Sequence, residues 1–468
     1  MTSSAPTPEP DAPSRRPSPD APVEPSRSRR PHVIAVVAYD SQLKWALGLV
    51  AEFTRRGWAS SVVVASDVRS ALSDEQVSTL GDVEIARMPW ADLLSVARRA
   101  DCVVLSVQGP LVQRFTDELE LLRRRAPGGG HEPIVVAGWV GIIIEKIVAG
   151  YLDRCAADVV AVNSADNLRD FTEAAHLLGL PTDNLLLSGL PLLPARPAPP
   201  REGPVRTVVF ADQPTVPAAS ADRAYLYQRL AEYARAHPER HVLLKPRHRP
   251  DEGTFHVMRH HPETVMARLP EAPPNFAITY EPVTELLPRT DLLLTVSSTA
   301  GLEAVGEGVR TAFIADLGVH EKFGNHVLLP SGLLATFDEI TADEIPSPRQ
   351  SWLADIFVDG DGRRPIERVV DRVEELRGAP PERRPGAAAS ASTHVAGRIA
   401  TYEHRLLMPT ATQTPAMRAA ARTAQLRTPA LVGVRTELVR RARLGAQAVL
   451  PRSWFEALRR ARARRRGA

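Results

Sequence analysis

Short runs of apolar residues alternate with amphipathic segments along most of this chain, and this alternation constrains its fold more than any other feature. The first series of runs comprises residues 33–38, 61–65, 102–107, 134–137 and 159–162. Runs that are apolar throughout are typical of parallel strands buried on both faces of a sheet. The segments between them, such as 42–56 and 111–125, carry apolar residues at helical spacing. Alternating strands and helices predict a doubly wound parallel sheet.

The same alternation restarts after a proline-rich stretch at 194–204. A second series of strands is expected at 207–211, 242–245, 276–279, 292–296 and 311–315, with helices near 221–236 and 366–376. At 468 residues, the chain is long enough for two such domains and for tails. We therefore predict an α/β fold with two doubly wound Rossmann-like domains, spanning 32–192 and 205–378, that face a cleft.

Both ends of the chain differ from the two domains in composition. Residues 1–31 hold nine prolines and six serines with almost no large apolar residue, so burial cannot offset the entropy lost on ordering them. We expect a disordered leader there. Residues 379–394 are rich in Ala, Pro and Arg and are expected to form a flexible linker, followed by helical segments over 395–468.

The C-terminal tail is strongly basic. Residues 435–468 carry eleven arginines against two glutamates, although the whole chain has a net charge of only +3. Leu450, Trp454 and Leu458 lie near one helical face among these arginines, which predicts a basic amphipathic helix for an anionic membrane surface. A nucleic-acid-binding or solubilising tail has similar charge. We favour the membrane because Trp454 and Phe455 supply an apolar anchor, and we expect no nucleic-acid partner.

The sequence indicates a cytoplasmic protein. No run reaches the roughly eighteen apolar residues that cross a bilayer, and the first residues contain no hydrophobic signal core. Cys102 and Cys155 lie far apart within apolar patterns, so they predict neither a disulfide framework nor a cysteine metal site. With the basic tail, peripheral attachment to the inner face of the cell membrane is a further expectation.

Two expected strands of the second domain end abruptly in polar or cationic residues. Leu243-Leu244 runs into Lys245-Pro-Arg-His-Arg-Pro250, and residues 292–296 run into Ser297-Ser298-Thr299 before a helical segment. The carboxyl ends of parallel strands face bound ligands in open α/β sheets. Hydroxyls and unpaired backbone N–H groups at the start of a helix bind phosphate. We interpret the two motifs together as the phosphate site of a nucleotide sugar.

Each residue of this site has a functional role and a plainer alternative. Lys245, His248 and Arg249 can neutralise a leaving phosphate, and His248, with a reference pKa of about 6.5, can also protonate it. Solvated surface charge is the alternative for these three. Glu303 can accept hydrogen bonds from ribose hydroxyls, or can simply be a first-turn acid favoured by the helix dipole. Helix capping is the alternative for the two serines.

The paired motifs resemble those of the two-domain glycosyltransferase fold called GT-B. The chain is similar to bacterial sialyltransferases, capsule polysialyltransferases and teichoic-acid glycerophosphotransferases, whose C-terminal domains carry a His-Pro motif and a Ser-Ser motif around the donor nucleotide. It also resembles uncharacterised actinobacterial proteins described only as glycosyltransferases by likeness. The resemblance covers approximately residues 32–378. Here Arg249 stands between His248 and Pro250, so the register of the His-Pro motif differs.

In that architecture the first domain binds the acceptor and the second binds the donor. The loop after the first strand reads Tyr39-Asp-Ser-Gln-Leu-Lys-Trp45 and occupies the acceptor side. By this resemblance, Asp40 is the candidate general base that takes the acceptor's proton, and Lys44 can contact acceptor or donor sugar. Helix capping is the alternative for Asp40. Gly138 and Gln213 follow other expected strands and are further cleft candidates.

No metal or cofactor is expected. His256, His260 and His261 come nearest to a metal cluster, but no second group of Cys, His or acidic residues stands at ligand spacing, so we expect surface histidines. The nucleotide sugar would be a substrate. The cations and the Ser-Ser-Thr helix start would stabilise the leaving group without an obligatory metal.

The sequence therefore predicts a glycosyltransferase that moves a sugar from a nucleotide donor, hexosyl or sialyl in type, to a hydroxyl acceptor. A cell-envelope glycan or a lipid-linked acceptor would suit a protein at the membrane. Inversion at the anomeric carbon is implied by the resemblance alone. A nucleotide-sugar epimerase on the same fold and a non-catalytic, membrane-associated envelope-assembly protein are the alternatives.

Overall fold

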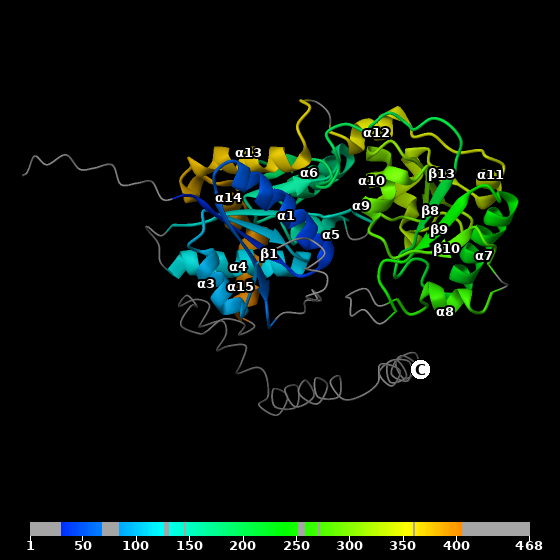
Figure 1. The fold of residues 1–468 in the computed structure, drawn as a ribbon. Coiled ribbons are helices and arrows are strands. Elements are labelled where there is room, and N and C mark those ends of the chain that lie inside the picture. Colours follow the sequence, from blue (N-terminus) through cyan, green and yellow to red (C-terminus); the bar gives the residue numbers. More distant parts are fainter. Residues whose placement is uncertain are drawn as a thin grey trace, which may run out of the picture.

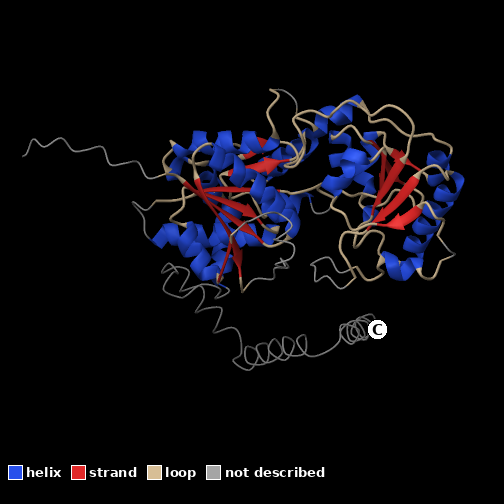
Figure 2. Cartoon of the chain, in the orientation of Figure 1, coloured by secondary structure: helices blue, strands red, loops and turns tan. Residues whose placement is uncertain are grey.

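The computed structural model describes residues 30–67, 84–125, 131–144, 147–250, 258–269, 272–358 and 361–404. The expected leader before Arg30 and the expected basic tail after His404 lie outside the described residues. Within them the chain forms two α/β domains, each built on its own sheet (Figure 1). Helices flank both sheets, as Figure 2 shows. The predicted fold class is confirmed.

The first sheet has seven parallel strands in the order β3-β2-β1-β4-β5-β6-β7 among the described residues. Its strands are β1 His32–Val37, β2 Ala59–Ala65, β3 Ile85–Met88, β4 Cys102–Ser106, β5 Ile134–Gly138, β6 Val159–Val162 and β7 Leu185–Leu187. Its helices are α1 Asp40–Arg55, α3 Trp90–Ala97, α4 Gly109–Arg125, α5 Ile147–Leu152 and α6 Ala165–Leu177. The five runs expected from the sequence are all strands of this sheet.

The second sheet has six parallel strands in the order β10-β9-β8-β11-β12-β13 within the described part of the chain. Its strands are β8 Thr207–Ala211, β9 His241–Lys245, β10 Phe276–Ile278, β11 Leu292–Thr295, β12 Arg310–Ile314 and β13 Leu334–Ala335. The associated helices are α7 Ser220–Ala236, α8 Pro262–Met266, α9 Val283–Leu286, α10 Ala300–Gly306, α11 Phe337–Thr341 and α12 Gln350–Ile356. Short 3₁₀ helices are η1 Leu287–Arg289, η2 Glu321–Phe323 and η3 Asn325–Ser331.

Both sheets reverse their strand order at the same relative place. In the first sheet the reversal lies between β1 and β4, and in the second it lies between β8 and β11. Open α/β sheets bind ligands in the crevice beyond the carboxyl ends of the strands at such a reversal. The loops after β1, β8 and β11 are therefore placed where a ligand would sit.

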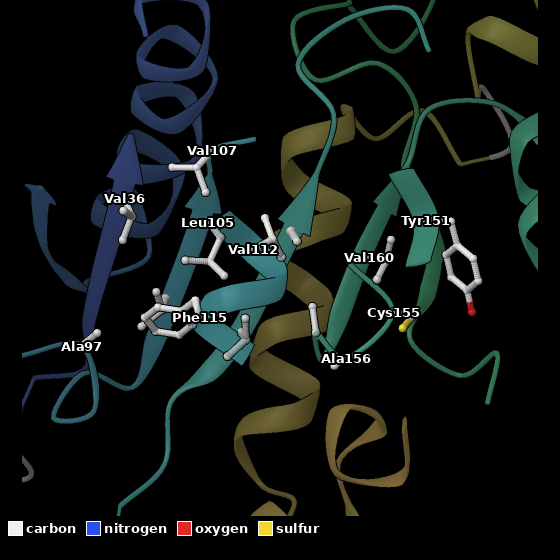
Figure 3. Close-up of a cluster of buried hydrophobic side chains, with 14 of the residues drawn as sticks. Val36, Ala97, Leu105, Val107, Val112, Phe115, Tyr151, Cys155, Ala156 and Val160 are labelled. Atoms are coloured by element: carbon white, nitrogen blue, oxygen red, sulfur yellow. The ribbon is translucent and has the colours of Figure 1, made fainter. Parts of the chain in front are cut away.

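The cores form because the strands are apolar on both faces. Val33, Ala35 and Val37 of β1 pack in one buried cluster, whereas Ile34 and Val36 pack in the cluster on the opposite face. Figure 3 shows the second of these clusters, with Val36 on β1, Leu105 on β4 and Val160 on β6. Each large side chain buried in this way stabilises the fold by about 1.5–3 kcal/mol.

Helix α13, Pro365–Arg377, corrects the expected domain boundary at residue 378. Its place in the sequence predicted the second domain, but Val369, Val370 and Val373 complete the core on the face of the first sheet that α1 covers. Arg56, the C-cap residue of α1, also donates hydrogen bonds to Asp371 at 2.6 Å and Glu374 at 2.7 Å. The chain therefore returns to the first domain after α12, and Figure 1 shows α13 lying beside α1.

The expected flexible linker at 379–394 is also wrong. It contains η4, Pro381–Arg383, and α14, Pro385–Ala391, and is followed by α15, Thr393–His404. Small residues let α14 approach closely: a Cβ on Gly386 would meet Asp158 Oδ1 at 2.7 Å. Arg398 of α15 pairs with buried Asp117 at 2.6 Å. The alanine-rich composition reflects close helix packing. None of the helices in the described part of the chain is long and apolar enough to span a membrane.

Candidate functional site

A cavity of about 720 Å³ lies between the two domains. Every site residue expected from the sequence lines it except Gly138. These lining residues are Asp40 and Lys44 from the first domain, and Gln213, Lys245, His248, Arg249, Ser297, Ser298, Thr299 and Glu303 from the second. Four loops at the carboxyl ends of β1, β8, β9 and β11 bring them together. The parallel topology of both sheets is what gathers residues that stand more than 250 positions apart in the sequence.

The first-domain contribution comes from the start of α1. Asp40 is the first residue of this helix, and Lys44 lies one turn further along the same face. Tyr39 occupies the N-cap position and Asp40 follows it inside the first turn, so Asp40 is not the N-cap residue of α1. Trp45, which follows Lys44, is fully buried and anchors this turn on the sheet.

The cationic loop after β9 is held by its own hydrogen bonds. Lys245 is buried, and its Nζ donates to the carbonyl of Pro246 at 2.8 Å. His248 is also buried, and its Nδ1 lies 2.9 Å from the carbonyl oxygen of Arg249. Because a carbonyl can only accept, Nδ1 carries a proton and donates it to this oxygen. The bond fixes the imidazole within the cationic loop.

His261 positions this loop, which the sequence did not suggest. It is buried, with Nε2 donating to the carbonyl of His248 at 3.1 Å and Nδ1 accepting the backbone N–H of Glu263 at 3.2 Å. The expectation that it is a surface histidine is therefore wrong. His260 is half-buried and His256 lies outside the described residues. No three His, Cys, Asp or Glu side chains in the described ranges gather closely enough to hold a metal ion.

The hydroxyl and the backbone N–H of Ser297 both donate hydrogen bonds within the second domain. Its hydroxyl donates to the carbonyl of Phe323 at 2.6 Å, and its backbone N–H donates to Gln213 Oε1 at 2.9 Å. Gln213 Nε2 in turn donates to Ser297 Oγ at 3.2 Å. Gln213 and Ser297 thus fix the loops after β8 and β11 to one another. Because the hydroxyl proton of Ser297 is donated to Phe323, it is not available for the predicted bond to phosphate.

Ser298 and Thr299 are the hydroxyls that reach the cavity beside the start of α10. Ser298 Oγ accepts the backbone N–H of Ala300 at 3.2 Å, so it does cap the helix, and its hydroxyl proton can still be donated. Thr299 is the N-cap residue and makes no side-chain capping bond. Helix α10 has only seven residues, so its dipole is a weaker phosphate attractor than the sequence suggested.

Two ion pairs in the described residues cross the cavity between the domains. Arg247 Nη2 lies 2.9 Å and 3.1 Å from the two carboxylate oxygens of Asp40. Lys44 Nζ lies 3.6 Å from Glu303 Oε2. Arg247 was not among the expected site residues, although it stands in the same cationic loop as His248 and Arg249. The sequence shows this run of cations, but it does not show which of them turns toward the other domain.

A buried ion pair lies beneath the second-domain side of the cavity. Arg223 of α7 is 1% exposed and donates to Asp212 at 2.9 Å, to the hydroxyl of Tyr227 at 3.0 Å and to the carbonyl of Pro214 at 2.9 Å. Burial raises the pKa of Asp212 to about 6, and the Arg223 charge opposes that rise. The pair braces the loop that carries Gln213. The sequence does not indicate this pair, because Arg223 lies on a helix 11 residues after Asp212.

Gly138 lies behind α1 and does not line the cavity. A Cβ at this position would meet the ring of Trp45 at 3.0 Å and Ala161 Cβ at 3.0 Å. Glycine is needed there so that α1 can pack on the sheet. Close approach also marks the domain contact, because a Cβ on Gly141 would meet Thr299 Oγ1 at 2.8 Å.

Two Rossmann-like domains with a ligand-sized cavity between their strand ends define a protein of the GT-B architecture. Residues 33–376 match a family described as "Putative glycosyltransferase (DUF6716)", and the chain belongs to this family. The comparison with curated proteins gives no match.

Several solved structures share low sequence identity with this chain. A kitacinnamycin glycotransferase is 15% identical over 79% of this chain and 99% of its own, with a TM-score of 0.39. MurG from Acinetobacter baumannii is 13% identical over 74% and 99%, with a TM-score of 0.42. A UDP-GlcNAc 2-epimerase from Neisseria meningitidis, bound to UDP-GlcNAc, is 10% identical over 74% and 100%, with a TM-score of 0.45.

Proposed function

We propose that this protein transfers a sugar from a nucleotide-sugar donor to a hydroxyl acceptor, with both substrates in the cavity between the domains. One observation carries this proposal: the cavity has a carboxylate, Asp40, on one wall and a cluster of cations on the other. A carboxylate can accept the proton of an attacking hydroxyl, and the cations can stabilise a departing phosphate. Sugar transfer needs these two functions on opposite sides of the reacting carbon.

The proposed reaction is a single displacement. The acceptor oxygen forms a bond to the anomeric carbon while the bond from that carbon to the donor phosphate oxygen breaks, and the electron pair leaves with the phosphate. Asp40 takes the acceptor's proton. Lys245 and Arg249 neutralise the departing nucleotide, and His248 in its imidazolium form donates a proton to it. Attack from the face opposite the phosphate inverts the anomeric centre.

The nucleoside would lie toward the loop after β10. Tyr280, Pro282 and Val283 line that end of the cavity and provide flat or apolar surface. Arg249 lies over the Tyr280 ring, with its guanidinium carbon 4.6 Å from the ring centre, so it links this surface to the cationic loop. Glu303 stands one turn into α10, within reach of a ribose. A base, ribose and phosphate in series would then run from Tyr280 to Arg249.

Metal independence is part of the proposal. Cationic side chains supply the charge that a divalent metal would otherwise bring to the leaving phosphate. Activity is therefore expected to survive EDTA. We also propose that the acceptor is a cell-envelope or lipid-linked glycan, reached by a cytoplasmic enzyme that is held at the inner face of the membrane by its basic tail. Vesicle binding of the full chain, compared with a chain ending at residue 404, tests that last point.

A thermal-shift screen tests the donor class. Purified full-length protein is heated with CMP, UDP, GDP and their sugar conjugates, and the screen is repeated with Ser298→Ala and His248→Ala. We expect one nucleotide to raise the melting temperature selectively, and each variant to reduce that shift. Asp166→Asn, an exposed aspartate paired with Arg169 outside the cavity, is the matched control and should keep the full shift.

Product analysis separates the alternatives. Incubation of the stabilising donor with acceptor glycans should yield the transferred product, with free nucleotide released in equal amount. A free epimer of the donor without any acceptor would establish an epimerase in place of a transferase. Failure of every nucleotide to stabilise well-folded protein would establish the non-catalytic alternative.

A further inference from the structure

The pair between Asp40 and Arg247 joins the candidate base directly to the candidate phosphate loop. In the sequence, Arg247 lies after Lys245 and directly before His248 and Arg249. Its Nη2 contacts both carboxylate oxygens of Asp40. Both side chains line the cavity and are half-exposed, at 43% for Asp40 and 39% for Arg247. The carboxylate of Asp40 is therefore held by a cation from the other domain, and that cation belongs to the loop proposed to bind the leaving phosphate.

Such a pair is easily exchanged. An ion pair in contact with solvent contributes little because water screens the charges and two long side chains must be ordered. A phosphate or diphosphate carries more charge than one carboxylate and matches the planar guanidinium equally well. An anionic ligand in the cationic loop would compete with Asp40 for Arg247.

A second pair of opposite polarity lies one helical turn away. Lys44 on α1 pairs with Glu303 on α10. The first domain therefore presents the anion Asp40 and the cation Lys44. The second domain places the cation Arg247 opposite Asp40 and the anion Glu303 opposite Lys44. Glu303 is the less exposed partner, at 17%. This second contact can hold α1 against the second domain after Asp40 has separated from Arg247.

We propose that Arg247 exchanges Asp40 for a donor phosphate, so that donor binding releases the carboxylate that accepts the acceptor's proton. Without a donor, the lone pairs of Asp40 face a guanidinium and do not act on an acceptor hydroxyl. With a donor, Arg247 turns to the phosphate and Asp40 becomes available. Arg247 thereby binds the donor and imposes donor-first order. The inference rests on the proposed function, because it assigns the anion to the donor.

Removing the charge of Asp40 should therefore tighten anion binding, which loss of structure would not do. Isothermal titration of the full chain with the nucleotide diphosphate and with inorganic pyrophosphate is compared for wild type, Asp40→Asn, Asp40→Ala and Arg247→Gln. We expect both Asp40 variants to bind about two- to fivefold more tightly, because the competing pair is gone. Arg247→Gln should bind about tenfold more weakly. Asp166→Asn should match wild type.

The outcomes distinguish this exchange from the proposed function. If wild type binds a nucleotide and both Asp40 variants bind it equally or more weakly, the exchange is overturned and the donor site stands. If pyrophosphate binding tightens in the variants but no nucleotide binds, the exchange stands and the nucleotide-sugar donor falls. If neither wild type nor the Asp40 variants bind any of these anions, both proposals fall.

Discussion

The two walls of the cavity are built differently. On the second-domain wall, each loop is fixed by bonds within that domain: His261 holds His248, Gln213 holds Ser297, and Arg223 holds Asp212. On the first-domain wall, Asp40 and Lys44 are held by partners across the cavity. The phosphate wall is thus ordered before any ligand arrives, whereas the base wall depends on the approach of the other domain. The second-domain wall can therefore bind phosphate by itself, whereas the base Asp40 must be brought to it by the approach of the first domain.

The largest test of this contrast is Arg223→Leu. It leaves Asp212 buried without its cation, which typically costs about 3–5 kcal/mol of unfolding free energy. The second domain should unfold first in urea, and nucleotide binding should be lost with it. Arg235→Gln, an exposed position on the same helix, should stay within about 0.5 kcal/mol of wild type.

The effect of pH sharpens this prediction. The pKa of Asp212 is already raised to about 6 by burial, and removal of Arg223 takes away a group that lowers it. A raised pKa means that the folded state holds its proton to higher pH than the unfolded chain, so folding becomes less favourable as pH rises through that range. The deficit of Arg223→Leu should therefore be smaller at pH 5 than at pH 8. An equal deficit at both would show that Asp212 is not the source.

The opposite wall is probed by Gly138→Ala. The added methyl would meet Trp45 and Ala161 at about 3.0 Å, and a clash in a packed core typically costs about 1–3 kcal/mol. Because Trp45 anchors the N-terminal part of α1, Asp40 and Lys44 should shift. Transfer rate should therefore fall while nucleotide affinity at the second-domain wall stays near wild type, as measured by initial rates and calorimetry.

Gly150→Ala provides the matched control for that variant. Its added methyl would meet Trp139 at 3.5 Å, which is ordinary contact, and alanine favours the helix in which it lies. Stability should be unchanged or slightly higher, with normal rate. If Gly138→Ala weakened nucleotide binding as much as transfer, the two walls would not be independent.

The fold was predictable because its signal is local and repeated. Uniformly apolar runs such as those of β1 and β8 can be satisfied only inside a covered parallel sheet, and the polar residues after β9 and β11 then fall at strand ends. The docking of α13 was not predictable, since its apolar face fits either domain and only the packing of Val369 and Val370 decides. Pairing across the cavity, as for Arg247, depends on the angle between domains, which no local pattern encodes.

Ser297 and Ser298 are adjacent in sequence and have the same side chain. Substituting each in turn distinguishes a stabilising role from a ligand-binding role within the second-domain wall. Ser297→Ala removes a buried hydroxyl and leaves the Phe323 carbonyl and Gln213 amide without it, which should cost about 1–2 kcal/mol of unfolding free energy. Ser298→Ala removes a capping oxygen and should cost at most about 1 kcal/mol. Nucleotide affinity should follow the reverse order, because only the Ser298 hydroxyl has a proton to give to phosphate. Urea unfolding and calorimetry on both variants measure the two quantities. Equal loss of affinity would mean that the Ser-Ser turn acts through its shape alone.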